Sequence, residues 1–452
     1  MSSSAIAYLS SFFNYETQAL QNKGFVFTLE RIQRLLAELE DPQKTYPVIH
    51  VAGTKGKGST CLFLSSILKE AGLKVGLYTS PHLYRPTERI RILGPRTSFA
   101  GPQGLFCGEI TPRQLEQVVA RVRPAIEKIR RQKESGPLTF FEVYTAIAFY
   151  FFAQQHVDAV VAETGLGGRL DATNATASDI CVFTPISYDH TQVLGKTIQA
   201  IAGEKAAIIK PGTRVVFSAQ QALRARLVIG QQARRCGCRV FTIGLDLQSK
   251  IISRDLSGSC FSFQGLEHYW PRLQSRLPGE HQVVNASLAA AVAEYFLGER
   301  SFSAFSAVTR GIAKARWPAR LEILTTKPLT VIDSAHNRDS AQKLKKAVTE
   351  LFPKKKIVLI FGASRDKDIP GILRELKGLS REVILTRASH PRSFVFSKRP
   401  KALVKNSHTY ITENARKALV LARRIASNDG IILVAGSVFL AGEIRKLCLS
   451  RT

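Results

Sequence analysis

Two kinds of apolar pattern alternate along most of this 452-residue chain. Short continuous apolar runs, typical of buried strands, are followed by segments in which apolar residues recur every three or four positions, as on one face of a helix. Strands that alternate with helices in this way form parallel-rich α/β sheets. Up to about residue 219 the runs predict strands at Pro47–Ala52, Val75–Thr79, Val157–Glu163, Ile180–Ser187 and Arg214–Ala219.

A second alternating series begins near Leu329 and predicts a separate, smaller open α/β sheet. Between the two series lie a β-rich stretch, Val240–Tyr269, and a helix, Asn285–Leu297. We therefore predict two domains, residues 1–315 and 316–452, as expected for a chain of this length. The elements of the second series are strands at Val331–Asp333, Ile357–Gly362, Val383–Thr386 and Ile431–Ala435, and helices at Ser340–Leu351 and Asn414–Ala426.

The composition is that of a folded globular protein, with 45% hydrophobic and 22% charged residues. No stretch reaches the ~20 apolar residues that a membrane helix needs, and the N-terminus lacks the pattern of a signal peptide. Leu138–Ala153 comes closest but contains Glu142, so we expect a buried helix there. The seven cysteines lack paired CxxC spacing, which argues against a disulfide framework or a zinc site and favours a cytoplasmic location.

The segment between the first predicted strand and the next helix is typical of a phosphate-binding loop. Closely spaced glycines let backbone N–H groups face an anion, and the helix adds the positive end of its dipole. Lys57 is expected to neutralise the β- and γ-phosphates of a nucleoside triphosphate, and Ser59 or Thr60 to place a hydroxyl near Mg2+. In the common pattern Ser or Thr directly follows the Lys, whereas here Gly58 follows Lys57, so the hydroxyl lies one position later. The alternative is that the segment is only a tight turn that binds no ligand. The segment reads Gly53-Thr54-Lys55-Gly56-Lys57-Gly58-Ser59-Thr60.

Candidate metal-binding and catalytic side chains follow the later strands of the first series. Glu163 ends a strand, and ligand groups gather at the carboxyl ends of parallel strands, so we expect it beside the phosphate loop, where it can hold Mg2+. His190 follows the next strand and should reach the same edge; a helix cap or a core hydrogen bond is the alternative. Lys205 lies in a helix of small and apolar residues. It is either a buried cation, a salt-bridge partner of Glu204, or a lysine whose ammonium group reaches the surface.

The formal net charge of +29 raises the question of a nucleic-acid partner. Lys and Arg are spread along the chain, with brief clusters at Lys354–Lys356 and Arg224–Arg235 but no basic tail or aromatic-interleaved stripe. We therefore expect a cationic protein that attracts anionic small molecules and binds neither nucleic acid nor membrane.

Seven motifs occur in an order that resembles one enzyme family. The motifs are the loop from Gly53, Thr79–Leu83, Glu88–Ile90, Gly165–Asn174, Asp189–Thr191, Glu204–Gly212 and Asp333–Asn337. Together they resemble the folylpolyglutamate synthase and dihydrofolate synthase family of the Mur ligase superfamily, and the resemblance runs from the helix Leu29–Leu39 to Gly436-Ser437.

The resemblance implies an N-terminal P-loop mononucleotide-binding domain with a parallel-rich sheet and a smaller C-terminal Rossmann-like ligase domain. It implies two Mg2+ ions, with ligands at Ser80, Glu163 and His190, and carbamylation of Lys205, whose added oxygens can ligate or orient the ions. Nucleotide or substrate contacts reached from the second domain and the linker are implied at Asn285, Arg320, Asp333 and His336.

The implied activity is the ATP-dependent addition of L-glutamate to the carboxyl group of dihydropteroate or a reduced folate, through an acyl phosphate, by a monomeric enzyme. Asp333 and His336 are candidates for orienting the nucleotide or the amine. The alternatives are a folylpolyglutamate synthase only, a Mur-type ligase acting on a cell-wall peptide precursor, and a nucleic-acid-binding ATPase.

Three features depart from the family pattern, the smallest being Ala207 where the family has Gly. Lys55 stands where the family usually has Asn, either as an extra cation near the phosphates or as a partner of a carboxylate. Pro95–Gly108 is a Pro- and Gly-rich insertion, which we expect to act as a mobile substrate loop.

Overall fold

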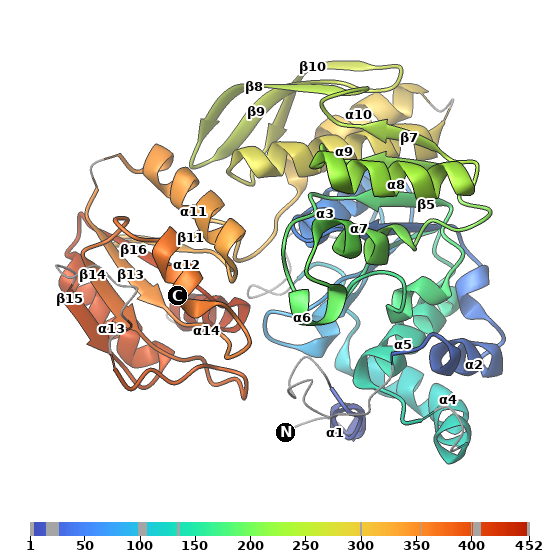
Figure 1. Ribbon diagram of the computed structural model, residues 1–452, viewed down its shortest axis with the longest axis horizontal. Helices are drawn as coiled ribbons and strands as arrows, with labels where there is room; N and C mark the ends of the chain where they lie inside the picture. The colour runs from blue at the N-terminus through green and yellow to red at the C-terminus, as the bar shows by residue number, and fades with distance from the viewer. Residues whose placement is uncertain are drawn as a thin grey trace. The chain divides into compact units, whose positions relative to one another are not determined.

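The structure is a computed structural model, and it describes residues 4–14, 27–97, 106–132, 136–298, 301–353, 355–398, 400 and 408–449. The chain divides into two compact units, which Figure 1 shows from blue to red along the chain. The first holds residues 1–254, 258–276 and 280–316, and the second holds residues 255–257, 277–279 and 317–452.

A seven-stranded sheet with the order β3-β2-β4-β1-β5-β6-β7 forms the centre of the first unit. Strands β2, β4, β1, β5, β6 and β7 are parallel, and β3 pairs antiparallel with β2. The central strands are buried along their whole length, which explains their uninterrupted apolar sequences. The strands are β1 Val48–Ala52, β2 Val75–Tyr78, β3 Ile90–Leu93, β4 Ala159–Glu163, β5 Ile180–Phe183, β6 Val215–Ser218 and β7 Arg239–Thr242.

Helices cover both faces of this sheet (Figure 1). On one face α2, α4 and α5 share a core with β1, β2 and β4, and α7 and α8 continue it over β5 and β6. On the other face α3 packs on β1, β2 and β4, and α9 packs on α3, β5 and β6. These helices are α1 Ser4–Ser10, α2 Glu30–Glu38, α3 Lys57–Glu70, α4 Pro112–Arg131, α5 Phe140–Gln154, α6 Thr191–Leu194, α7 Ile198–Ala206, α8 Leu223–Arg235, α9 Glu280–Leu297 and α10 Ser301–Lys314, with 3-10 turns at Pro42–Lys44, Pro86–Arg89 and Ala172–Ala175.

The predicted β-rich stretch forms an antiparallel sheet with the order β10-β9-β8. Its strands are β8 Gln248–Asp255, β9 Gly258–Gln264 and β10 Tyr269–Ser275. Trp270 of β10 is buried and stacks on Phe263 and on Phe305 of α10, so an aromatic cluster joins this sheet to a helix of the first unit.

The insertion Pro95–Gly108 begins at the end of β3. Because β3 is antiparallel, Leu93 pairs with Val75 at the start of β2, at the sheet edge opposite to the phosphate loop. Gly108 returns beside β3, since its carbonyl accepts the N–H of Ile92 at 2.8 Å. Residues 98–105 lie outside the described residues. The placement of both ends weighs against the substrate-loop role, which stays a prediction.

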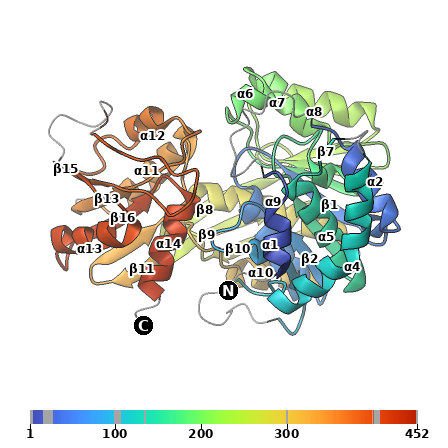
Figure 2. The ribbon, with the colours of Figure 1, turned by 90° about the horizontal axis from the view of Figure 1, so that it is seen from below.

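The second unit is built on a six-stranded sheet with the order β11-β12-β16-β13-β14-β15, parallel except for β11. Helices α11 and α12 share a core with one face, and α13 and α14 lie on the other (Figure 2). The predicted fold class, two α/β units each with a parallel-rich sheet, is confirmed. The elements are β11 Glu322–Thr326, β12 Leu329–Ile332, α11 Arg338–Leu351, β13 Ile357–Phe361, α12 Ile369–Glu375, β14 Glu382–Leu385, β15 His408–Ile411, α13 Ala415–Ala426, β16 Ile431–Ala435 and α14 Val438–Leu449.

Candidate active site

The predicted phosphate loop connects β1 to α3. Gly53 has φ +149° and Gly56 has φ +87°, both in the region that favours glycine. A Cβ on Gly56 would lie 2.3 Å from Oδ1 of Asn285, and a Cβ on Gly53 would lie 1.9 Å from Oγ1 of Thr184. Glycine is therefore required at both positions, and α3 starts at Lys57 with its N-terminal end at the loop.

Lys57 and Glu163 lie together at the carboxyl edge of the seven-stranded sheet. Val51 of β1 pairs with Glu163, the last residue of β4, so the loop and the carboxylate occupy neighbouring strand ends. Lys57 Nζ donates to the Gly53 carbonyl at 3.2 Å and lies 4.0 Å from Glu163 Oε1. The predicted proximity of Glu163 to the phosphate loop is thus present in the structure.

Ser80 joins the same group from the end of β2. Its backbone N–H donates to Glu163 Oε2 at 3.2 Å. Among the described residues no group of three or more His, Cys, Asp and Glu side chains forms a metal site. Glu163 supplies a carboxylate and Ser80 a hydroxyl, which are oxygen ligands of the kind that Mg2+ takes together with phosphate and water.

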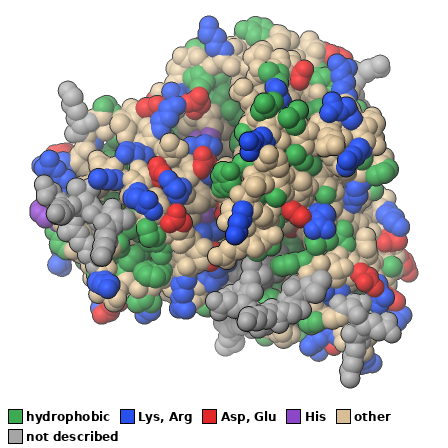
Figure 3. All heavy atoms as spheres, in the orientation of Figure 1, with side chains coloured by type: hydrophobic (Ala, Val, Ile, Leu, Met, Phe, Trp, Pro, Cys, Tyr) green, Lys and Arg blue, Asp and Glu red, His purple; other side chains and the backbone are tan. Residues whose placement is uncertain are grey.

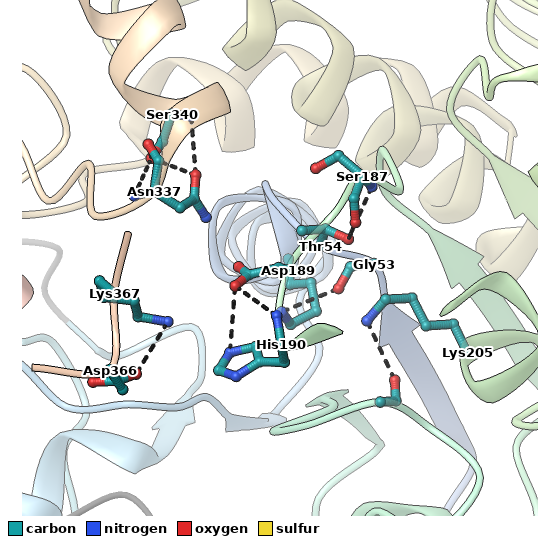
Figure 4. A network of polar contacts seen from close by, with 12 residues as sticks. Gly53, Thr54, Ser187, Asp189, His190, Lys205, Asn337, Ser340, Asp366 and Lys367 are labelled. Atoms are coloured by element: carbon teal, nitrogen blue, oxygen red, sulfur yellow. Dashed lines mark hydrogen bonds and ion pairs between the residues drawn. The ribbon is translucent and has the colours of Figure 1, made fainter. Parts of the chain in front are cut away.

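His190 follows β5 at the same sheet edge and precedes α6. Its backbone is left-handed, with φ +49°, and its side chain does not cap the helix, so the capping alternative does not apply. Asp189 Oδ1 accepts the N–H of His190 at 3.0 Å and lies 3.7 Å from Nε2 (Figure 4). The imidazole is partly exposed and therefore accessible to a ligand.

Lys205 of α7 is buried, with 4% of its surface exposed. Its Nζ donates to the carbonyl of Gly167 at 3.5 Å (Figure 4), while Glu204 pairs with Arg169 at 2.9 Å. The alternatives of a surface lysine and a Glu204 partner therefore do not apply. Burial, followed by the charge of Lys57, lowers the pKa of Lys205 to about 7. A large fraction of this amine is neutral at physiological pH, which is the form that reacts with CO2.

Three further P-loop residues have distinct surroundings. The hydroxyl of Thr54 is bonded to the main chain of Ser187, and the backbone N–H groups of Thr54 and Lys55 both point to the Pro185 carbonyl, at 3.0 and 3.4 Å. Thr60 Oγ1 is buried without a hydrogen-bond partner among the described residues. Such a hydroxyl is a candidate for a ligand-facing group.

Asn285 lies on α9 in the first unit, within the predicted first domain. Its Oδ1 faces Gly56, and its Nδ2 donates to Gln282 at 3.0 Å. Asn285 thus packs directly against the phosphate loop.

Arg320, Asp333 and His336 lie in the second unit, near the carboxyl end of β12. The partly buried Asp333 carboxylate accepts the N–H groups of Leu321 and Ala335 at 3.0 and 2.8 Å. Burial raises the pKa of Asp333, and the charge of Arg320 opposes that shift. His336 Nδ1 donates to the Ser334 carbonyl at 2.8 Å, which fixes the tautomer of the neutral ring and leaves Nε2 unprotonated.

The start of α11 closes this group in the second unit. Ser340 donates its N–H to Asn337 Oδ1 at 3.0 Å, and its Oγ donates to the Asn337 carbonyl at 2.9 Å (Figure 4). The Ser340 hydroxyl also accepts the N–H of His336 at 3.1 Å. The helix cap therefore holds His336 in place.

A buried polar chain behind the site was not anticipated from the sequence. His50 Nε2 lies 2.8 Å from Thr173 Oγ1, and its Nδ1 lies 3.2 Å from Ser178 Oγ. Thr173 Oγ1 donates to Asp171, whose other oxygen accepts the N–H of Leu166 at 2.7 Å. Burial lowers the pKa of His50 to about 3, so the ring is neutral. The only sequence signal was a polar residue inside an apolar strand.

The chain matches two families of Mur ligase domains, the Mur ligase middle domain over residues 125–293 and the Mur ligase, glutamate ligase domain over residues 319–438. It is 33% identical to the dihydrofolate synthase/folylpolyglutamate synthase of Bacillus subtilis, over 92% of this chain and 94% of that protein. The chain belongs to the dihydrofolate synthase/folylpolyglutamate synthase family of Mur ligases.

Solved structures of this family agree with the assignment. The folylpolyglutamate synthase of Mycobacterium tuberculosis, complexed with ADP and AMPPCP, is 32% identical with a TM-score of 0.85 and covers 93% of this chain and 95% of its own. A folylpolyglutamate synthase complex with AMPPCP and folate is 29% identical with a TM-score of 0.79 and covers 98% of both chains. The family resemblance expected from the motifs is therefore confirmed.

Proposed function

We propose that this chain is a bifunctional dihydrofolate synthase/folylpolyglutamate synthase, an ATP-dependent ligase that joins the amine of L-glutamate to the carboxyl group of dihydropteroate and of reduced folates. The observation that carries the proposal is the group formed by the glycine loop, Lys57 and Glu163 at one sheet edge, in a chain that matches this family along nearly its whole length. We assign ATP binding to residues 1–315 and the C-terminal ligase domain to residues 316–452.

The reaction requires activation of a carboxylate, which does not react with an amine as it stands. A carboxylate oxygen attacks the γ-phosphorus of ATP, ADP leaves, and an acyl phosphate results. The nitrogen of glutamate then attacks the acyl carbon, loses a proton, and displaces phosphate. Lys57 and the N-terminal end of α3 stabilise the negative charge that spreads over the transferred group.

Ser80, Glu163 and His190 would hold Mg2+, which supplies Lewis acidity and neutralises phosphate charge when it is bound. The juxtaposition of Ser80 and Glu163 supports the assignment. Glu163→Gln and His190→Ala should each raise the Mg2+ concentration required for half-maximal activity. Unchanged activation curves in both variants would contradict it.

Carbamylation of Lys205 is supported by its burial and its lowered pKa, since the neutral amine adds CO2. Lys205→Ala should be inactive and should recover partial activity with an added small carboxylate such as acetate. Wild-type activity of the variant would contradict the carbamylation of Lys205. So would a free Lys205 amine in the active wild-type protein, measured by mass spectrometry.

In the second unit, His336 and Asp333 would orient the amine or the nucleotide, and Arg320 would add positive charge near the phosphates. The fixed tautomer of His336, with Nε2 able to accept a proton, supports its role.

One assay tests the function itself. Dihydropteroate and tetrahydrofolate are offered separately with ATP, Mg2+ and labelled L-glutamate, and the products are separated by chain length. Extension of both substrates is expected. Extension of tetrahydrofolate alone would reduce the function to folylpolyglutamate synthase, and extension of neither would refute the folate assignment.

A further inference from the structure

The hydroxyl of Thr54 forms hydrogen bonds with a neighbouring loop. Its Oγ1 donates to the carbonyl of Ser187 at 3.0 Å and accepts the N–H of Ser187 at 3.0 Å (Figure 4). Its backbone N–H donates to the carbonyl of Pro185 at 3.0 Å. A phosphate oxygen requires donors, and both donors of Thr54 are already engaged. In this arrangement Thr54 does not contact the nucleotide through its hydroxyl, although its place in the loop suggested such a contact.

The loop held by Thr54 leads directly to His190. Only Tyr188 and Asp189 separate Ser187 from the histidine, and Asp189 Oδ1 accepts the backbone N–H of His190. The left-handed φ of +49° at His190 means that its orientation depends on a specific local path of the chain.

A second anchor fixes the same loop from the other side. Gln221 accepts the N–H of Ile186 at 2.9 Å through Oε1 and donates to the Thr184 carbonyl at 3.1 Å. Gln221 follows β6 and does not belong to the phosphate loop. Besides the backbone bonds of Thr54 and Lys55 to Pro185, the Thr54 side chain is therefore what ties this loop to the nucleotide-binding segment.

We propose that Thr54 is a positioning residue that couples the phosphate loop to His190. Its side chain fixes the position of His190, the metal ligand, relative to a phosphate group bound at the loop. This inference rests on the proposed function, in which His190 is a Mg2+ ligand. Residues that orient a metal ligand typically contribute about 10- to 100-fold to metal affinity without touching the metal.

Three variants separate this role from the alternatives. Thr54→Val keeps the shape of the side chain but removes the hydroxyl. Thr54→Ser keeps the hydroxyl and serves as the conservative rescue. Ser187→Ala is the matched control, because Ser187 contacts Thr54 only through its main chain and its own Oγ has no hydrogen-bond partner among the described residues.

The readout is the binding of AMPPCP, a non-hydrolysable ATP analogue, by calorimetry with Mg2+ varied and also without Mg2+, alongside ligase activity. For Thr54→Val we expect the Mg2+ concentration at half-saturation to rise about tenfold, with metal-free AMPPCP binding changed less than about twofold. Thr54→Ser and Ser187→Ala should follow the wild-type curve. Thermal melts establish that each variant is folded.

An unchanged Mg2+ curve for folded Thr54→Val would overturn the proposal, as would equal weakening of AMPPCP binding with and without Mg2+, which assigns Thr54 to direct nucleotide contact. If Thr54→Val does not fold, Thr54→Ala, which also removes the hydroxyl, takes its place: a raised Mg2+ requirement in Thr54→Ala supports the coupling and an unchanged one refutes it. Failure of the wild-type protein to ligate glutamate would instead refute the proposed function.

Discussion

Two lysines of the candidate site differ in what surrounds their ammonium groups. Lys57 lies near the carboxylate of Glu163 and the carbonyl of Gly53. Lys205 is buried and bonds a carbonyl. A buried cation without a close carboxylate is costly, so the two residues should respond differently to substitution.

Lys57→Ala is expected to lower ligation at least about 100-fold while the fold is kept, because the loop backbone forms without this side chain but the transferred phosphoryl group requires its charge. Steady-state kinetics and a thermal melt measure both effects. Lys196→Ala, which removes an exposed lysine, is the control. Near-normal turnover of a folded Lys57→Ala protein would exclude Lys57 from the site.

Lys205→Met should stabilise the protein in CO2-depleted buffer near pH 7. The pKa of Lys205 falls from 10.5 to about 7 on folding, so between these values the unfolded chain holds a proton that the folded chain has released. Stability of the wild type therefore rises with pH across this window. The advantage of Met, up to about 4 kcal/mol at pH 7, should shrink toward pH 10.5.

Denaturant unfolding of Lys205→Met and the wild type at several pH values checks this dependence, with the exposed Lys196→Met as control. A stability difference that does not change with pH would mean that Lys205 is not buried as a bare amine.

Among the elements of the site, α3 is flanked by a glycine at each end. Gly56 and Gly72 stand just before and just after this helix, with φ of +87° and +93°. Gly56 faces Asn285, whereas a Cβ on Gly72 would meet nothing within 4 Å. The two positions thus share a backbone strain but differ in contact.

Gly72→Ala should cost only about 1–2 kcal/mol of stability, because it adds a Cβ in a left-handed conformation. Gly56→Ala should cost more and should also abolish AMPPCP binding, since the new Cβ displaces Asn285 or distorts the loop. Unfolding curves and calorimetry measure both. Equal effects of the two variants would show that the Asn285 contact is unimportant.

The elements that the sequence revealed best are those whose residues are uniformly buried. Strands β1, β4, β13 and β16 are continuous apolar runs, and each was located to within about two residues. Strand β3 was not recognised because it carries Arg91, which is buried beneath Phe106 at 5.1 Å and breaks the apolar pattern.

The site was predictable where the chemistry follows strand ends. Glu163 could be placed beside the loop because parallel strands align their carboxyl ends. The burial of Lys205 could not be read from its helix, and the Thr54–Ser187 bonds join residues 133 positions apart. Such contacts depend on the packing of whole elements, which no local pattern specifies.

At the scale of the whole molecule the main feature is the net charge of +29. On the face shown in Figure 3, Lys and Arg side chains are scattered among acidic and apolar ones and do not form one stripe. No helix among the residues that the structure describes is long and apolar enough to span a membrane. The charge is therefore expected to act as a diffuse field on anionic substrates.

Raising the salt concentration from about 0.05 to about 0.5 M should increase the apparent KM for the folate substrate several-fold with little change in kcat, because the field is screened within a few ångströms. Initial-rate measurements at both salt levels, with a neutral osmolyte as control, test this. A salt-independent KM would mean that the charge serves another purpose, and retention on DNA at physiological ionic strength would favour a nucleic-acid partner.

In the proposed reaction, ATP activates a pteroate or folate carboxyl group for attack by glutamate. The most direct measurement uses dihydropteroate labelled with oxygen-18 in its carboxyl group, together with ATP, Mg2+ and L-glutamate. Each new amide bond should be accompanied by ADP and by phosphate carrying one labelled oxygen. Formation of AMP and pyrophosphate, or of phosphate without label during ligation, would contradict it.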